Sequence, residues 1–161
     1  MKNIRKLTLC AVLAGLYAAI TILAAPLSYG LIQFRLSEAL IVLCCFEPFL
    51  GIGITLGCFL ANLFSTITFL DIFIGTAATA LACLWTARCR NPWLMPIPNI
   101  LCNAILVGGM LAFVMFPDAL AAGFATSALQ VGFGEAVVMY LLGVPLYFFE
   151  KKTGFLKKAL S

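Results

Sequence analysis

The sequence predicts an all-α polytopic membrane protein, with six transmembrane helices forming one membrane-embedded domain over residues 1–161. Charged residues make up 10% of the chain and apolar residues 64%, whereas a soluble domain carries about 25% charged residues. Because one transmembrane helix needs about 20 apolar residues, a chain of 161 residues holds roughly six of them and leaves no room for a soluble domain. A water-soluble globular fold is excluded.

Six uncharged stretches define the predicted spans, at residues 7–25, 36–47, 49–65, 69–87, 97–116 and 126–149. The first is closed by Pro26. The second and third share one apolar stretch divided by Glu47-Pro48, so we expect the second helix to be short, tilted or partly buried by its neighbours. The fourth stops at Arg88, the fifth before Pro117 and the sixth before Glu150.

The basic residues predict the orientation. Nine of the ten fall at the amino end, in the turn after the fourth span and in the carboxyl tail: Lys2, Arg5, Lys6, Arg88, Arg90, Lys151, Lys152, Lys157 and Lys158. By the positive-inside rule, both termini of a multi-pass protein of the cell membrane are then cytoplasmic. The tenth, Arg35, falls at the outer end of the second span.

Several kinds of chemistry are excluded or disfavoured. The chain has no histidine, which removes Ser-His hydrolysis and histidine metal ligands. It has no Gly-rich phosphate-binding loop with its lysine, and its seven cysteines show no CxxC spacing. The only aspartates are Asp71 and Asp118, and the second lies in a loop beside Pro117, which disfavours a paired-aspartate intramembrane enzyme. We therefore expect no catalysis and no cofactor or metal in this chain.

Ionisable and amide residues inside the spans are the candidate site. Inserting each charged side chain there costs about 2.5 to 3.5 kcal/mol on insertion scales, so its position reflects either an ion pair or a functional role. Arg35, Glu38, Asn62, Asp71 and Glu135 all fall toward the outer half, and we expect them to line a pocket open to the outside. An alternative is that Arg35 forms only a structural ion pair, with Glu38 or with Asp71.

Two further patterns mark helix faces. Asn99 and Asn103 are four residues apart, hence on one face of the fifth span; Asn103 is as suited to binding as to interhelical hydrogen bonding, whereas Asn99 is expected to be structural. The first span carries small residues on two adjacent faces, Ala11, Gly15 and Ala19 on one and Ala14 and Ala18 on the other. A second protein could contact the face that the bundle does not use.

Particular strings resemble a known family. Residues 28–40 read SYGLIQFRLSEAL, and further matching strings lie at 61–63, 70–76, 103–108 and 132–136. They resemble the QueT family, the queuosine-precursor substrate-binding (S) components of energy-coupling factor (ECF) transporters. The resemblance covers roughly Leu7 to Pro145.

The resemblance implies a six-helix S component that binds a 7-deazaguanine from outside. It also implies docking on the membrane subunit EcfT, which is coupled to two ATPases that use the ATP; no nucleic acid is involved. Either small-residue face of the first helix could dock. Two alternatives remain. One is a sibling S component for another vitamin-like substrate, and the other is an autonomous small transporter or channel that uses Glu135 as its ion or proton site.

The substrate's chemistry then suggests roles for the candidate residues. A 7-deazaguanine presents an N–H beside an exocyclic amine, a donor pair that a carboxylate such as Glu135 or Glu38 can accept. A cationic aminomethyl group would favour a further acid such as Asp71. Polar and aromatic partners complete the predicted substrate-binding set: Arg35, Asn62, Asn103 and Gln33 for polar contacts, and Tyr29 and Phe34 for stacking on the ring.

Overall fold

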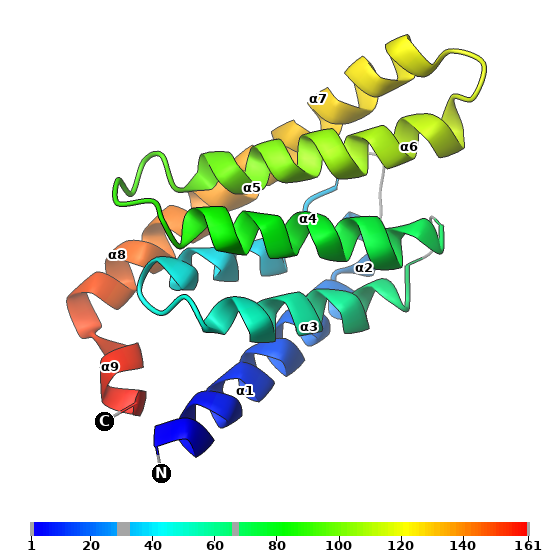
Figure 1. Cartoon of the computed structure of the whole chain (residues 1–161). Helices are drawn as coiled ribbons and strands as arrows, with labels where there is room; N and C mark the ends of the chain where they lie inside the picture. The colour runs from blue at the N-terminus through cyan, green and yellow to red at the C-terminus, as the bar shows by residue number, and fades with distance from the viewer. Residues whose placement is uncertain (1, 29–32, 66–67, 161) are drawn as a thin grey trace.

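The computed structural model describes residues 2–28, 33–65 and 68–160, and within these ranges it contains helices and no strands. The helices lie side by side, and the two ends of the described chain come together at one end of the molecule (Figure 1). The elements in chain order are α1 (Lys2–Leu23), α2 (Ala25–Ser28), the 3₁₀-helix η1 (Leu36–Cys45), α3 (Leu50–Asn62), α4 (Leu70–Thr86), α5 (Pro96–Cys102), the π-helical segment η2 (Asn103–Val107), α6 (Gly108–Met115), α7 (Leu120–Val138), the π-helical segment η3 (Met139–Gly143), α8 (Val144–Thr153) and α9 (Phe155–Leu160).

Each of the six predicted spans coincides with a helical stretch. Within the described ranges, three stretches are long and apolar enough to cross a membrane: Asn3–Leu23, Pro96–Met115 and Leu120–Thr153. The others, η1, α3 and α4, are shorter apolar helices. The helix that carries the last predicted span begins at Leu120, six residues before the predicted start of the span at residue 126. The chain is therefore a helical membrane protein, while the count of six crossings and the cytoplasmic placement of the termini stay predictions.

The second span is short and buried, as its sequence predicts. η1 is a 3₁₀-helix of 10 residues, and every residue from Ser37 to Cys44 is buried. At about 2.0 Å per residue it is about 20 Å long. Its sequence is apolar on nearly all sides, which suits a helix enclosed by others. The neighbours α1, α4, η3 and α8 surround it.

Glycines let α1 and α3 approach closely. A Cβ placed on Gly53 would lie 2.4 Å from the carbonyl oxygen of Cys10, and one on Gly57 would lie 2.6 Å from that of Ala14. Small residues at such a helix contact allow the two backbones to pack directly. On the neighbouring face of α1, a Cβ on Gly15 would meet nothing within 4 Å.

We expect Gly53→Leu to lower the stability of the protein. The new side chain would collide with the backbone of α1, and forced overpacking typically costs about 1 to 3 kcal/mol. Thermal unfolding in detergent measures the effect. Gly15→Leu is the matched control, because it makes the same change at an open helical position. Equal melting temperatures for the two variants would contradict the predicted close contact.

Two of the long apolar stretches, Pro96–Met115 and Leu120–Thr153, are each interrupted by a π-helical segment. In η3 the N–H of Val144 bonds to the carbonyl of Met139, five residues back. Pro145 follows directly and has no N–H to donate, so a wider turn replaces the regular α-helical bond there. Asn103 opens η2, and π-helical turns of this kind occur frequently at functional sites.

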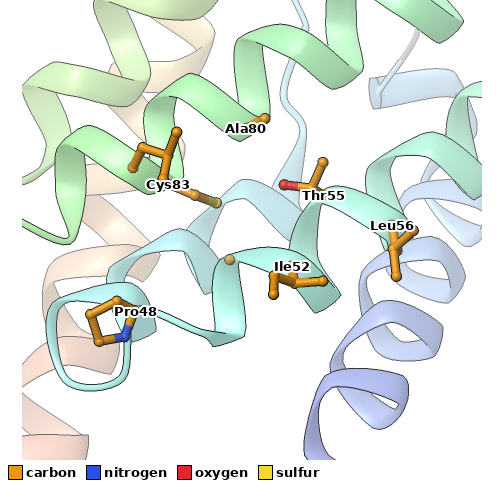
Figure 2. A pocket seen from close by; sticks show the side chains of 8 residues that line it. Pro48, Ile52, Thr55, Leu56, Ala80 and Cys83 are labelled. Atoms are coloured by element: carbon orange, nitrogen blue, oxygen red, sulfur yellow. The ribbon is translucent and has the colours of Figure 1, made fainter. Parts of the chain in front are cut away.

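Two apolar grooves flank α3 on the surface of the bundle. One lies between α3 and α4, has a volume of about 310 Å³ and is lined in part by Ile52, Thr55 and Ala80 (Figure 2). The other lies between α1 and α3 and has a volume of about 380 Å³. Ile52 and Leu56 line both grooves.

Candidate functional site

A non-helical segment carries Arg35 into the interior of the bundle. The N–H of Phe34 donates to the carbonyl of Leu27 at 2.9 Å, which holds this segment against the end of α2. From the other side α7 packs on it so closely that a Cβ on Gly134 would lie 2.2 Å from the carbonyl oxygen of Gln33. Gln33 and Arg35 are both buried as a result.

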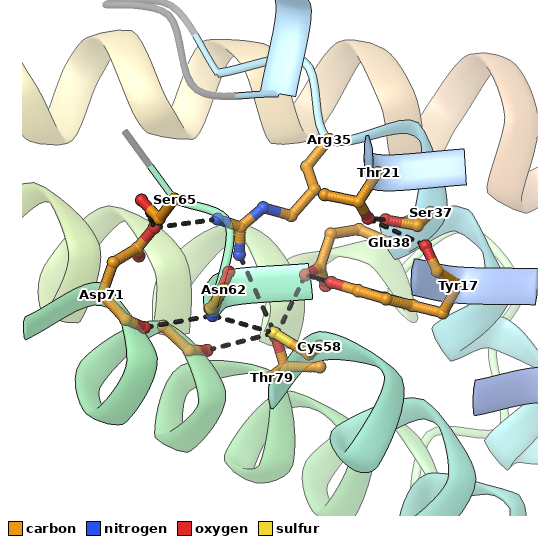
Figure 3. Close-up of polar contacts among 11 residues, drawn as sticks. Tyr17, Thr21, Arg35, Ser37, Glu38, Cys58, Asn62, Ser65, Asp71 and Thr79 are labelled. Carbon is orange, nitrogen blue, oxygen red and sulfur yellow. Dashed lines mark hydrogen bonds and ion pairs between the residues drawn. The ribbon is translucent and has the colours of Figure 1, made fainter. Parts of the chain in front are cut away.

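Arg35 forms a buried ion pair with Asp71. Its Nη2 lies 3.5 Å from Asp71 Oδ2. The same carboxylate oxygen accepts a hydrogen bond from Ser65 Oγ at 2.8 Å, and Arg35 Nη1 lies 3.8 Å from Cys58 Sγ (Figure 3). The ion pair thus joins the segment before η1 to the start of α4. Of the two partners that the sequence offers for Arg35, Glu38 and Asp71, the structure pairs it with Asp71.

Glu38 is held by hydroxyl groups from two other helices. Its Oε1 accepts hydrogen bonds from the hydroxyl of Tyr17 on α1 and from Thr79 Oγ1 on α4, the latter at 3.0 Å. One turn away, Thr21 Oγ1 and Ser37 Oγ lie 2.6 Å apart. These contacts tie η1 to α1 and α4 on both sides of the carboxylate (Figure 3).

Asn62 joins the end of α3 to the ion pair. Its Nδ2 donates to the backbone carbonyl of Asp71 at 3.0 Å and to Cys58 Sγ at 3.4 Å. Gly75 makes this possible, because a Cβ there would lie 2.7 Å from Asp71 Oδ1 and 2.8 Å from Asn62 Nδ2. Arg35, Asp71, Asn62 and Glu38, with the groups that bond to them, are called the central network below.

A second buried chain of hydrogen bonds ends on Glu135. Asn103 Nδ2 donates to Asn99 Oδ1 at 2.9 Å, and Asn99 Nδ2 donates to Glu135 Oε2 at 2.8 Å. All three residues are buried. Asn99, expected to be structural, is thus in direct contact with the carboxylate of α7.

Some buried polar atoms of the site have no hydrogen-bond partner within the described ranges. They are Glu38 Oε2, Asn62 Oδ1, Asp71 Oδ1 and Gln33 Nε2. Leaving a buried donor or acceptor unpaired costs about 1 to 3 kcal/mol, so native proteins normally satisfy such groups. The three oxygens among these four atoms can accept hydrogen bonds from donor groups of a ligand.

The predicted binding residues fall into three groups. Arg35, Glu38, Asn62 and Asp71 lie in the central network, Asn103 and Glu135 lie in the second chain, and Gln33 is buried beside Arg35. Phe34 is half-buried on the same segment, and Tyr29 lies outside the described residues. The expected pocket, lined by these groups and open to the outside, is not found in the described part of the chain. The ionisable side chains are buried instead: Arg35, Glu38, Asp71 and Glu135 are at most 2% exposed.

Sequence reasoning missed four contributors: Tyr17, Cys58, Ser65 and Thr79. Hydroxyl and thiol side chains are common in apolar helices and carry no signal of their own. Asn99 was singled out by its spacing of four residues from Asn103, and its hydrogen bond to Glu135 is an interhelical contact of the kind expected of it. Among the described residues no group of three or more Cys, Asp or Glu side chains is placed to hold a metal ion.

The helices are long and apolar enough to cross a membrane, and they enclose ionisable groups in their interior. These features define a polytopic membrane protein with an intramembrane polar site, an arrangement that is typical of transporters. The chain belongs to the QueT transporter family, whose model matches residues 7–152. The resemblance in the sequence strings is thereby confirmed.

One characterised relative is similar over part of the chain. It is the queuosine precursor transporter QueT of Lactococcus lactis subsp. cremoris, 37% identical over 71 residues. The alignment covers 43% of this chain and 41% of the relative, so the chain matches less than half of the relative's length. No solved structure matches the chain significantly.

Proposed function

We propose that this chain is the substrate-binding S component of an ATP-driven ECF importer, and that it captures a queuosine precursor of the 7-deazaguanine type from outside. Membership of the QueT transporter family and the name of the relative support the substrate class. The observation that carries the proposal is the buried site itself, in which side-chain oxygens of Glu38, Asn62 and Asp71 are among the atoms with no hydrogen-bond partner within the described ranges.

The chemistry of a 7-deazaguanine fits the buried polar side chains of the central network and of the chain that ends on Glu135. Its ring N–H and exocyclic amine form a donor pair that the carboxylate of Glu135, oriented by Asn99, can accept. An aminomethyl cation would be accepted by Glu38 or Asp71, whose free oxygens lie in the central network. Gln33 Nε2 can donate to the ring carbonyl.

Calorimetry on the purified chain tests the substrate assignment. We expect binding of 7-aminomethyl-7-deazaguanine or its 7-cyano analogue, and no binding of thiamine or riboflavin. Native mass spectrometry of the same preparation detects any ligand that co-purifies. A flavin or thiamine mass would contradict the substrate assignment and would favour a sibling S component.

Docking on EcfT is assigned to the stripe Ala11, Gly15 and Ala19 of α1. These three residues are exposed, whereas Ala14 is buried against α3 and Ala18 is half-buried. The exposed stripe is therefore the face that a partner helix can approach closely. ATP hydrolysis belongs to the two partner ATPases, and this chain contributes no cofactor.

We expect Gly15→Leu to prevent co-purification with EcfT and to abolish uptake in cells, with substrate binding by the isolated chain unchanged. The leucine would fill the surface on which the partner helix packs. Gly109→Leu on α6 is the control, because a Cβ there meets only Phe124 at an ordinary 3.7 Å. Normal uptake by Gly15→Leu would contradict the docking assignment. Substrate accumulation in liposomes containing this chain alone would contradict the subunit role and favour an autonomous transporter.

A further inference from the structure

We infer that one anionic phospholipid binds on the membrane face of α3, with its two acyl chains in the two grooves beside this helix and its headgroup at Lys6. The inference rests on the shape and charge of this surface and is independent of the proposed substrate, and the second groove shares Ala11 with the stripe assigned to EcfT docking. It assigns a ligand to a part of the molecule that contributes nothing to the polar site.

The two grooves share a ridge. The groove between α3 and α4 is lined by Pro48, Gly51, Ile52, Thr55, Leu56, Ala80, Cys83 and Leu84 (Figure 2). The groove between α1 and α3 is lined by Asn3, Lys6, Leu7, Cys10, Ala11, Phe49, Ile52 and Leu56. Ile52 and Leu56, 63% and 53% exposed, stand between them. Two parallel depressions separated by one ridge suit the two chains of a single lipid.

Both grooves start at the same end of the bundle and have a similar length. The first runs along α3 from Pro48 to Leu56 and the second along α1 from Asn3 to Ala11. Eight residues of helix correspond to about 12 Å. One leaflet of the hydrocarbon core is about 15 Å thick, half of roughly 30 Å, so each groove follows an acyl chain through most of one leaflet.

The charged group of the two linings lies where a headgroup would be. Asn3 and Lys6, both exposed, line the entrance of the second groove, and Lys6 Nζ lies 4.9 Å from the centroid of the Phe49 ring. Beyond this entrance the walls are apolar apart from Thr55. A cation held above an apolar groove matches a phosphate above its acyl chains.

The surrounding charges favour an anionic headgroup over a zwitterionic one. Arg5 lies on the same helix end as Lys6. Two acids, Glu47 and Glu150, line a different hollow together with Lys151 and Lys157. Basic residues at the end of a membrane helix attract anionic lipids. The alternative occupant, a helix of a protein partner, is distinguished by the experiment.

Native mass spectrometry of the purified full chain tests the inference. The protein is equilibrated with equal amounts of phosphatidylglycerol and phosphatidylcholine carrying the same acyl chains. We expect one phosphatidylglycerol to be retained in preference. Lys6→Gln should reduce that preference about fivefold, whereas Lys151→Gln, which removes an exposed lysine at another position, should leave it unchanged.

A groove variant tests the acyl-chain site separately. Thr55→Trp fills the groove between α3 and α4 and should reduce retention of both lipids. Equal retention of the two lipids by the unmodified protein, or equal effects of Lys6→Gln and Lys151→Gln, would overturn the inference. So would a Thr55→Trp variant that keeps its lipid but no longer co-purifies with a membrane partner, because the groove would then hold a helix.

Discussion

Replacing Glu135 with glutamine is expected to weaken binding of a 7-deazaguanine by tenfold or more, equivalent to at least about 1.4 kcal/mol. The carboxylate offers two acceptor oxygens to the paired N–H donors of the substrate. One of these oxygens, Oε2, already accepts a hydrogen bond from Asn99. A glutamine keeps one acceptor and places an NH₂ group against the other donor. Calorimetry in detergent measures the change in Kd.

Two further variants sharpen this result. Glu47→Gln makes the same change at a half-buried glutamate outside the site and should leave the affinity unchanged. Asn99→Ala removes the group that orients Glu135 and should weaken binding less than Glu135→Gln does. Unchanged affinity in Glu135→Gln would exclude this carboxylate from the binding site, while leaving the membership of the transporter family intact.

Replacing Arg35 with methionine is expected to destabilise the protein by about 3 to 5 kcal/mol. The variant leaves Asp71 buried without the guanidinium that lies 3.5 Å away, and removing one partner of a buried pair leaves an uncompensated charge. Thermal unfolding in detergent measures the loss. Arg88→Met is the matched control, because that arginine is exposed and its Nη1 donates a hydrogen bond to a backbone carbonyl, that of Leu84.

The double variant Arg35→Met with Asp71→Asn separates charge pairing from packing. If the ion pair is the main interaction, the double variant should be more stable than the sum of the two single losses predicts. Additive losses, or an Arg35→Met variant as stable as Arg88→Met, would contradict an important role for the pair. Since both residues are also candidates for substrate binding, stability and affinity have to be measured on the same preparations.

Much of the helical organisation was predictable because apolar runs are a local property of the chain. Every predicted span has a helical counterpart, and Glu47-Pro48 correctly separates η1 from α3. The last helix begins six residues before the predicted start of its span, and no side-chain cap at Ala119 marks that helix start. The 3₁₀ and π-helical segments were not predicted. Of these, η3 ends two residues before Pro145, whose missing N–H removes a regular α-helical bond.

The site was predictable only in part. Charged and amide residues are conspicuous in apolar helices because burying them is costly, so Arg35, Glu38, Asp71 and Glu135 could be singled out. Tyr17 and Thr79 could not, because their role depends on reaching Glu38 from helices that lie 21 and 41 residues away along the chain. The substrate-binding roles of the four ionisable residues stay predictions.

By itself the sequence determined the class of protein, the helical stretches and the family, since composition, apolar run length and local strings are sufficient for each. The tertiary structure decided which groups meet. It pairs Arg35 with Asp71, links Asn99 to Glu135, and buries Ala14 while leaving Gly15 exposed. The physical reason is that side-chain partners and open faces depend on which helices pack together, and in this chain glycines such as Gly53, Gly57 and Gly134 set how closely they pack.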